Sequence, residues 1–231
     1  MEIIAEIGQN HNGDMELAKE MIFAAAEAGA DTAKFQVYNA QSLFPKNNNP
    51  WFSYNCKTEL SRNQVEDLFT VCEGANIEFM ASVFDIERIS WLEAIGVKRH
   101  KVASRSINDF KMIESLCRTG KELLVSLGMW NKKNFPEIPS KKTKFLYCIS
   151  KYPTPLEEIK LSEVCFSEYH GFSDHSVGIG AAVAAFARGA GIVEKHFTLD
   201  KKAYGPDHQC SMTLPELKNL VLIKNQILKC L

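Results

Sequence analysis

Polar residues recur in pairs, two positions apart, near the ends of several β-rich runs of this 231-residue sequence. The four pairs are Lys34 with Gln36, Ser150 with Tyr152, Ser173 with His175, and Glu194 with His196. Because side chains at i and i+2 of a strand point to the same face, both members of each pair can enter one site. Four further polar residues lie in or near such runs: Glu6, Lys101, Ser104 and Ser126.

The chemical types in this set indicate an anionic, phosphorylated substrate and a divalent metal. Lysine and serine side chains are good hydrogen-bond donors to phosphate oxygens. Imidazoles together with carboxylates suit Mn, Fe, Zn or Co better than Ca or Mg. A metal ion with open coordination positions can polarise a carbonyl or bind a reacting water.

A structural interpretation competes with the functional one for each residue. A histidine on a strand is more often a hydrogen-bonded core residue than a metal ligand, and a lysine near a strand end can extend its ammonium to solvent. Glu6 can be an ion-pair partner rather than a base. The metal interpretation of His175 and His196 depends on their occurring together, each two residues after a polar partner. Asp174 and Lys195 fall on the opposite strand faces and are interpreted as structural.

Eight short β-rich runs alternate with helical patterns, which is typical of βαβ units and a parallel sheet. The predicted strands span residues 3–8, 32–37, 78–84, 99–104, 122–128, 143–150, 170–176 and 192–198. A closed TIM barrel has eight parallel strands and places its active site at their carboxyl ends. We therefore predict an α/β fold, a TIM (β/α)8 barrel, with residues 1–231 forming a single catalytic domain.

Helical patterns fill most of the gaps between these strands. Asp14 is a predicted N-cap, and Ser61-x-x-Gln64 and Thr213-x-x-Glu216 are predicted capping boxes. The pattern is missing in one place, the connection after the fifth strand, where two prolines interrupt the chain. Helix 5 of the barrel is therefore expected to be reduced.

Two connections between the predicted elements are unusual. Residues 38–60, which follow the second strand, are long and contain several aromatic residues. Loops of that length in a compact domain are often functional, although mobile insertions are nearly as common. Residues 204–208 follow the last strand and contain Asp207 and His208.

Composition and charge argue against several classes of partner. The net charge is −1 and the lysines and arginines are scattered along the sequence. Proteins that bind nucleic acids or anionic membranes normally show a basic stripe instead. The seven cysteines contain no C-x-x-C pair, which argues against a disulfide framework or a structural zinc site. No basic stretch precedes the first apolar run, and the apolar run 177–193 is short and contains Arg188, so it is interpreted as a buried helix. We expect a cytoplasmic protein that binds neither nucleic acid nor membrane.

Several longer motifs follow one another along nearly the whole chain. They are IAEIG at 4–8, NHNG at 10–13, AGAD at 28–31, KFQ at 34–36, KVAS at 101–104, SLGM at 126–129, YPTP at 152–155, GFSDHS at 171–176, EKHFT at 194–198 and GPD at 205–207. Any one motif is weak, but the ordered set resembles the N-acetylneuraminate (sialic acid) synthase family. That family includes the legionaminic and pseudaminic acid synthases and spore-coat polysaccharide relatives.

The resemblance implies a barrel enzyme that uses phosphoenolpyruvate, an N-acetylmannosamine-type sugar and a divalent metal, commonly manganese. In that family, the residues that match His175 and His196 hold the metal. The residues that match the phosphoenolpyruvate site are Lys34, Ser82, Lys101, Ser104, Ser126, Ser150 and Ser173. The residues around the sugar, the metal-bound water and the reacting carbons match Glu6, Gln36, Tyr152 and Glu194.

The implied reaction forms a carbon–carbon bond. C3 of phosphoenolpyruvate attacks the open-chain sugar aldehyde, water adds at C2, and the tetrahedral intermediate expels phosphate to leave a sialic-acid-like nonulosonate. Either Glu6 or Glu194 is the candidate for proton transfer.

Some features depart from the family pattern. Full-length synthases carry a C-terminal antifreeze-like domain whose arginine enters the partner subunit's sugar pocket, whereas this sequence ends after the eighth helix. Ser82 stands where a threonine is common, and Ser150 where many members have asparagine. We expect either a different acceptor sugar or a separately encoded antifreeze-like domain as a partner, and a homodimer stays an open expectation.

Two other functions remain as alternatives. A Schiff-base aldolase or lyase would use Lys34 or Lys101, with a pKa depressed by burial beside another cation. A barrel that binds a sugar phosphate without turning it over is the non-enzymatic alternative. The presence of both histidines and both lysines argues against that last interpretation.

Overall fold

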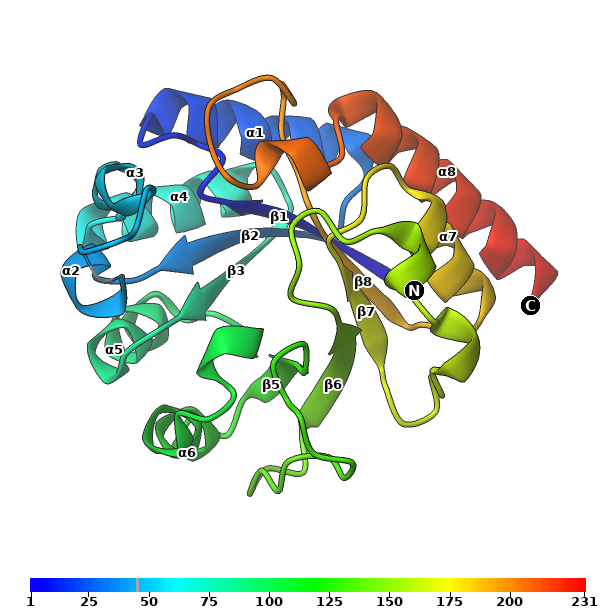
Figure 1. Cartoon of the computed structure of the whole chain (residues 1–231). Helices are drawn as coiled ribbons and strands as arrows, with labels where there is room; N and C mark the ends of the chain where they lie inside the picture. Colours follow the sequence, from blue (N-terminus) through cyan, green and yellow to red (C-terminus); the bar gives the residue numbers. More distant parts are fainter. Residues whose placement is uncertain (45) are drawn as a thin grey trace.

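The computed structural model describes residues 1–44 and 46–231, in which eight parallel strands form a closed barrel in the order β1 to β8. The strands are β1 (Glu2–Gly8), β2 (Thr32–Val37), β3 (Glu78–Val83), β4 (Arg99–Val102), β5 (Glu122–Ser126), β6 (Thr143–Cys148), β7 (Gly171–Asp174) and β8 (Ile192–His196). The barrel closes where β1 pairs with β8 and Glu6 aligns with His196. Helices surround the strands in Figure 1. The predicted TIM-barrel class is confirmed.

The interior of the barrel changes from apolar to polar toward the carboxyl ends of the strands. An apolar cluster within the barrel consists of Ile4, Met80, Leu124, Leu146 and Ile192. Two residues further along the same strands stand Glu6, Ser82, Ser126, Cys148 and Glu194, all of them buried. Because i and i+2 share a strand face, these side chains form the next layer, directly above an apolar plug.

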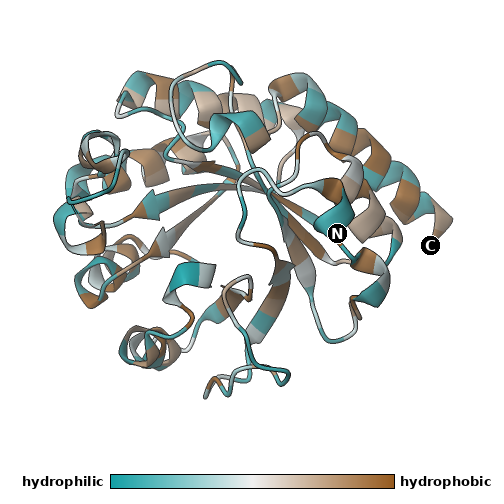
Figure 2. Ribbon diagram, in the orientation of Figure 1, coloured by the Kyte–Doolittle hydropathy of each residue, from teal (hydrophilic) through white to brown (hydrophobic). Residues whose placement is uncertain are grey.

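The outer face of the strands packs against the surrounding helices. Ile3, Ala5 and Ile7 of β1 belong to the same buried cluster as Met21 and Ile22 of the first helix. Figure 2 shows strands that are largely hydrophobic at the centre of the molecule and helices with mixed surfaces around them. Burial of apolar area between these two layers supplies the main stabilisation of the fold.

The α-helices of the described residues are α1 (Met15–Ala28), α2 (Ala40–Leu43), α3 (Phe52–Lys57), α4 (Arg62–Gly74), α5 (Ile86–Ile95), α6 (Phe110–Arg118), α7 (Gly180–Ala187) and α8 (Leu214–Cys230). Three of the α-helices, α1, α4 and α8, begin at the caps that the sequence predicts. The Asp14 side chain accepts hydrogen bonds from the amides of Glu16 and Leu17 at the start of α1. Capping boxes begin both α4 and α8, as predicted.

Two barrel connections lack an α-helix within the described residues, whereas the sequence pattern predicted only one. The connection from β5 to β6 has none, which agrees with the expected reduction of helix 5. The connection from β6 to β7 has only two 3-10 turns, Leu156–Glu158 and Leu161–Glu163, so the prediction of a single missing helix was wrong. Pro153 and Pro155 disfavour a helix at the start of this segment, and Leu161 packs on the core from a 3-10 turn.

Several strands end earlier than predicted, so some polar residues lie just beyond them. β4 ends at Val102, and Ser104 begins a 3-10 turn. β7 ends at Asp174, whose carboxylate accepts the backbone N–H of Ser176 at 2.8 Å in place of a strand partner. Asp174 also pairs with Lys195 at 2.9 Å, and both side chains are fully buried, as expected of structural residues.

The apolar run 177–193 contains the short helix α7, as predicted. Among the described helices, none is both long and apolar enough to span a bilayer.

Candidate active site at the carboxyl-terminal end of the barrel

Two adjoining cavities lie at the carboxyl ends of the strands. The inner one, here called the deep well, is lined by twelve of the thirteen predicted site residues: Glu6, Lys34, Gln36, Ser82, Lys101, Ser104, Ser126, Tyr152, Ser173, His175, Glu194 and His196. Ser150 is the exception, since it lines the second, outer cavity. The structure therefore gathers the predicted residues from all eight strands, or from the segments just after them, at one place.

Two carboxylates and two lysines form an ion-pair network in the deep well. Lys34 Nζ lies 2.7 Å from Glu6 Oε2 and 3.6 Å from Glu194 Oε2. Lys101 Nζ lies 3.5 Å from Glu194 Oε1. All four side chains are almost fully buried, so solvent and salt screen their interactions only weakly. A bound phosphate or carboxylate would meet two ammonium groups that are already in place.

Serine hydroxyls complete this network. Lys34 Nζ donates a hydrogen bond to Ser82 Oγ at 3.1 Å, and Lys101 Nζ donates to Ser126 Oγ at 2.8 Å. Ser173 Oγ donates to Glu194 Oε1 at 2.9 Å. These contacts hold each long side chain in one rotamer, so less conformational entropy is lost when a ligand binds.

The two carboxyl groups differ in proton affinity. Burial raises the pKa of Glu6, and the neighbouring charge of Glu194 adds to this effect, against the opposing charge of Lys34. Burial also disfavours the charged form of Glu194, but Lys101 and Lys34 outweigh it and bring the pKa of Glu194 to about 2. Glu6 is thus the carboxyl group that gains a proton more readily, while Glu194 stays ionised.

The pKa values of the two lysines are also shifted in opposite directions. Burial lowers the pKa of Lys101, and the positive charge of Lys34 contributes in the same direction. Burial acts on Lys34 too, but Glu194 and Glu6 outweigh it and raise its pKa.

His175 and His196 face each other beside the ring of Tyr152. The two imidazole centres lie 5.8 Å apart, and the Tyr152 ring lies 4.1 Å from that of His175. His175 Nδ1 lies 2.8 Å from the carbonyl oxygen of Ile149; donation from Nδ1–H in this contact leaves Nε2 free as a ligand. Burial lowers the pKa of His196 to about 4, so its ring is neutral near pH 7.

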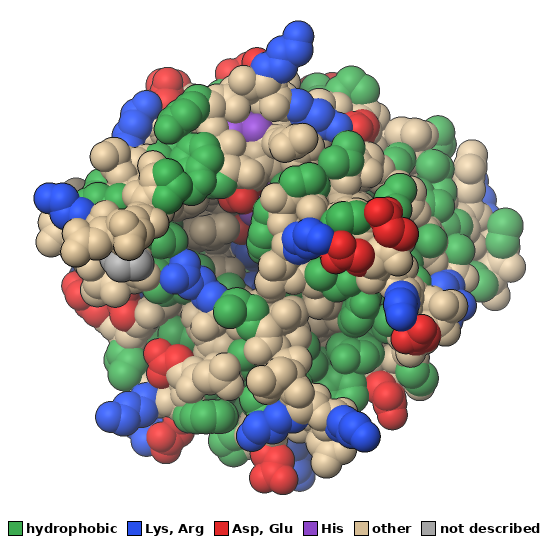
Figure 3. Space-filling view, viewed as in Figure 1, with side chains coloured by type: hydrophobic (Ala, Val, Ile, Leu, Met, Phe, Trp, Pro, Cys, Tyr) green, Lys and Arg blue, Asp and Glu red, His purple; other side chains and the backbone are tan. Residues whose placement is uncertain are grey.

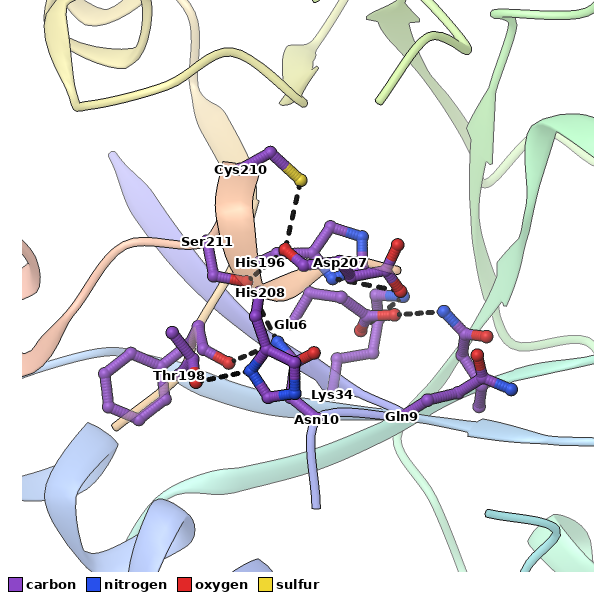
Figure 4. A network of polar contacts seen from close by, with 12 residues as sticks. Glu6, Gln9, Asn10, Lys34, His196, Thr198, Asp207, His208, Cys210 and Ser211 are labelled. Atoms are coloured by element: carbon purple, nitrogen blue, oxygen red, sulfur yellow. Dashed lines mark hydrogen bonds and ion pairs between the residues drawn. The ribbon is translucent and has the colours of Figure 1, made fainter. Parts of the chain in front are cut away.

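Asp207 approaches His196 from the loop after β8. Its Oδ2 lies 3.9 Å from His196 Nδ1, the contact drawn as a dashed line in Figure 4. Figure 4 also shows that Glu6 and Lys34 lie close to this pair, on strands β1 and β2. The loop after β8 therefore adds a carboxylate beside the imidazole of His196.

The two imidazoles fit a shared divalent cation. Metal–nitrogen bonds of about 2.1 Å allow two rings this far apart to bind one ion between them. His196 Nδ1 and Glu194 Oε2 are buried without a hydrogen-bond partner in the described part of the chain, which leaves polar groups that a bound ion or water would satisfy. No group of three or more His, Cys, Asp or Glu side chains is arranged as a metal site among residues 1–44 and 46–231. The chain would thus supply the two imidazoles, and water or substrate the remaining ligands.

The predicted set omits Cys148 and Asp207. The deep well is also bordered by Phe84, Ala103, Asp174 and Lys195, the last two of which were expected to face away from it. Cys148 lines the deep well, with its Sγ 3.4 Å from Ser104 Oγ and 3.9 Å from His175 Nδ1. It stands two residues before Ser150, so extending the alternating pattern backward along the strand would have found it. Asp207 belongs to the GPD motif, but its spacing from β8 gave no indication that it faces an imidazole.

Gly128 allows three of these side chains to converge. A Cβ at this position would lie 2.5 Å from Ser150 Oγ and 2.8 Å from Cys148 Sγ. Its backbone N–H donates to Ser104 Oγ at 3.0 Å. The glycine after β5 is therefore needed for a close approach between the chain and the hydroxyl groups of the site.

The outer cavity opens above the deep well and is larger and less polar. The described residues that line it are Gln9, Gln36, Phe44, Asn49, Trp51, Asn55, Phe84, Ala103, Ser104, Arg105, Met129, Ser150, Tyr152, His196, Pro206 and Asp207. Figure 3 shows a hollow on this face with charged side chains on its floor and hydrophobic side chains along parts of its rim. Amides and aromatic rings of this kind suit a polyhydroxylated ligand with an apolar substituent.

Comparison with known proteins identifies the class to which this barrel belongs. The sequence model of a family described as "NeuB family" matches residues 21–231. The chain is 37% identical to the N,N'-diacetyllegionaminic acid synthase of Legionella pneumophila, covering 95% of this chain and 70% of that protein. It is 36% identical to the N-acetylneuraminate-9-phosphate synthase of Homo sapiens, covering 95% of this chain and 68% of that protein.

A solved structure agrees with this result. The N-acetylneuraminic acid (sialic acid) synthetase from Leptospira borgpetersenii, in complex with citrate, superposes with a TM-score of 0.92 at 33% identity over 99% of this chain and 84% of that one. The fold and the site define a phosphoenolpyruvate-dependent condensing enzyme. The chain belongs to the NeuB family. This assignment disfavours both the Schiff-base and the non-catalytic alternatives.

Proposed function

We propose that the chain condenses phosphoenolpyruvate with an N-acetylmannosamine-type aldehyde to form a nonulosonate and inorganic phosphate. The observation that carries the proposal is the position of Lys34 and Lys101, which lie in one well with His175 and His196. A buried trianion requires cations and hydrogen-bond donors around it. The relatives named above act on different sugars, so the class of acceptor is part of the proposal.

Each group in the deep well has a proposed task. The two lysines, together with Ser82, Ser104, Ser126, Ser150 and Ser173, would hold the phosphate and carboxylate of phosphoenolpyruvate. Gln36 and Tyr152 would orient the acceptor where the two cavities meet, since both line the deep well and the outer cavity. His175 and His196 would hold a divalent metal, proposed to be Mn²⁺, which when bound polarises the aldehyde oxygen.

The bond changes balance without an external oxidant or reductant. C3 of phosphoenolpyruvate forms a bond to the aldehyde carbon, and the aldehyde oxygen takes up a proton. Water adds to C2 and loses one proton. The C2–O bond to phosphate then breaks while the new C2 hydroxyl gives its proton to the departing phosphate, which leaves a 2-keto acid and hydrogen phosphate. Placing both reactants at one site converts the encounter into an oriented, effectively unimolecular step.

We propose Glu6 rather than Glu194 for proton transfer. The pKa of Glu6 is raised, which brings it closer to the operating pH, whereas the pKa of Glu194 at about 2 keeps that group ionised. Glu194 would instead stabilise the two lysines and Ser173. This distinction depends on burial and ion pairing, not on residue type.

We also propose that residues 1–231 act as one catalytic domain. All the proposed groups come from the barrel strands and the segments just after them. A reducing, cytoplasmic location belongs to the same proposal and is supported by the seven cysteines, none of which is paired with another. A homodimer or a separate antifreeze-like domain as partner stays a prediction.

The decisive experiment measures phosphate release by the purified chain with phosphoenolpyruvate and a panel of N-acetylated hexoses, after EDTA treatment and again after Mn²⁺ is restored. Activity should require the metal. His175→Ala and His196→Ala should each lower it at least about 100-fold, because a metal ion supplies several kcal/mol of charge stabilisation. Both variants should also lose Mn²⁺ affinity in a calorimetric titration. Glu6→Gln should lose turnover while it retains Mn²⁺ binding.

The matched control is His170→Ala, which removes an exposed histidine beside the amino-terminal side of β7. It should keep full activity and full Mn²⁺ affinity. EDTA-resistant turnover, or normal activity of either site variant, would contradict the metal assignment.

A further inference from the structure

Arg105 is the one lysine or arginine among the described residues that line the outer cavity. The cavity has one carboxylate in the same set, Asp207, and that group faces His196. The remaining lining is neutral: amides, hydroxyls, aromatic rings and small apolar groups. Arg105 follows β4 and Asp207 follows β8, and these strands lie four places apart in the closed order of eight. The positive and the negative group therefore enter the cavity from opposite sides of the barrel.

Contacts with the β2 loop position the Arg105 guanidinium without neutralising it. Arg105 Nη2 donates to the carbonyl oxygen of Leu43 at 3.2 Å, and the guanidinium lies 4.8 Å from the centre of the Phe44 ring. None of the ion pairs among the described residues includes Arg105. A guanidinium has five N–H donors, so one such contact leaves a fork available to an oxyanion.

Arg105 lies just outside the deep well, where the outer part of a bound substrate would be. Ser104 lines both cavities, whereas Arg105, the next residue, lines only the outer one. The aldehyde must reach phosphoenolpyruvate in the deep well, so the rest of an open-chain sugar has to extend outward. The substituent at the far end of that chain would therefore be the one that meets Arg105.

We propose that Arg105 binds a phosphate ester at the end of the acceptor distant from its aldehyde, so that the preferred acceptor is an N-acetylhexosamine 6-phosphate. This inference rests on the proposed function, since it names the acceptor class for the same site. Repulsion from Asp207 directs an anion away from the loop after β8 and toward Arg105. A planar guanidinium that is fixed by an aromatic ring can hold two phosphate oxygens at once.

The test compares N-acetylmannosamine with its 6-phosphate for the wild type, Arg105→Gln, Arg105→Lys and Arg62→Gln. The wild type should show a higher kcat/KM for the phosphorylated sugar. Arg105→Gln should lower that value about 10- to 100-fold, the usual effect of losing a hydrogen bond to a charged group. Its kcat/KM for the neutral sugar should change less than about threefold. Arg105→Lys should retain part of the preference.

Arg62→Gln is the matched control, because it removes an exposed arginine that pairs with Glu66 at 2.9 Å on α4 and not in the cavity. It should behave as the wild type does. Equal losses for both sugars in Arg105→Gln, or a wild-type preference for the neutral sugar, would overturn the inference.

A binding measurement separates failure of this inference from failure of the proposed function. The reduced sugar alcohol 6-phosphate has no aldehyde and cannot condense, so its calorimetric Kd is independent of catalysis. If no acceptor is turned over but the Kd still weakens at least tenfold in Arg105→Gln, the proposed function fails and the phosphate site stands. If neutral sugars are condensed and the Kd is the same in both proteins, the function stands and the phosphate site is refuted.

Discussion

Residues of one type behave differently in this molecule because their surroundings differ. Glu6 and Glu194 both lie in the deep well, yet the pKa of one is raised and that of the other is about 2. Lys34 and Lys101 diverge in the same manner. The assignment of chemical roles therefore depends on which opposite charges lie nearest, and each such neighbour comes from another strand.

His11 provides a test of burial away from His175 and His196. Its ring is fully buried, Nδ1 accepts a hydrogen bond from the Gly13 N–H at 3.1 Å, and Nε2 has no partner among the described residues. Burial lowers the pKa of His11 to about 4, against an ordinary value of 6.5. Between these values the unfolded chain binds the proton and the folded chain does not, so stability falls as pH falls through this window.

We predict that His11→Asn reduces the pH dependence of unfolding. The Asn side-chain oxygen can still accept the Gly13 N–H, but it has no proton to gain. The wild type should lose about 2 kcal/mol of unfolding free energy between pH 7.5 and pH 5 through His11, and the variant should lose correspondingly less. Urea titrations followed by tryptophan fluorescence at both pH values measure the difference. His170→Asn, an exposed control, should keep the wild-type dependence; an unchanged slope in His11→Asn would contradict the prediction.

At the level of elements, the long connection after β2 meets the loop after β8 through an aromatic cluster. The ring centres of Trp51 and Tyr204 lie 5.3 Å apart, and those of Tyr54 and Tyr204 lie 5.9 Å apart. Tyr54 OH also donates to the backbone oxygen of Gln9 at 2.9 Å. The connection contains α2 and α3 and contributes part of the outer cavity wall, including Trp51.

We predict that Tyr204→Ala weakens acceptor binding without changing phosphoenolpyruvate binding. Tyr204 does not line the outer cavity, but it packs on Trp51, which does. Loss of the aromatic contacts should raise the acceptor KM about two- to tenfold, with the phosphoenolpyruvate KM unchanged. Steady-state kinetics with each substrate varied in turn decides this. Phe110→Ala removes an exposed aromatic residue of α6 and should change neither KM. A rise in both constants for Tyr204→Ala would show that the cluster supports the whole site.

At the level of the whole molecule, the barrel closes only if its last strands approach closely. Gly171 of β7 aligns with Ile192 of β8 and with Leu146 of β6. A Cβ at Gly171 would lie 2.2 Å from the backbone oxygen of Ile192. The neighbour is backbone, so relief requires the two strands to separate, and β7 and β8 carry Ser173 and Glu194.

We predict that Gly171→Ala destabilises the fold and lowers activity together. Overpacking of this kind costs about 1–3 kcal/mol, which urea unfolding would detect. Gly74→Ala, at the end of α4, is the matched control: a Cβ there meets nothing within 4 Å. That variant should gain up to about 1 kcal/mol, because alanine is the better helix former. Wild-type stability in Gly171→Ala would show that the strands tolerate separation.

The sequence by itself determined the order of the strands, three of the helix caps and most of the residues that line the deep well. Period-two polar pairs, capping boxes and ordered motifs are local features, and each depends on residues a few positions apart. The same features predicted a TIM barrel and located His175, His196 and the lysines at its active end. They could not predict the second missing helix or the early ends of β4 and β7, because packing and side-chain hydrogen bonds decide those boundaries.

The tertiary structure decided which groups meet and in what charge state. Glu6 and Glu194 are far apart in sequence, and their different proton affinities depend on distances to the two lysines that only closure of the barrel sets. The same closure brings Cys148 and Asp207 close to the histidines. It places Arg105 in the outer cavity, beside the deep well. Burial and Coulomb interactions act through space, so they follow from the folded arrangement and not from spacing along the chain.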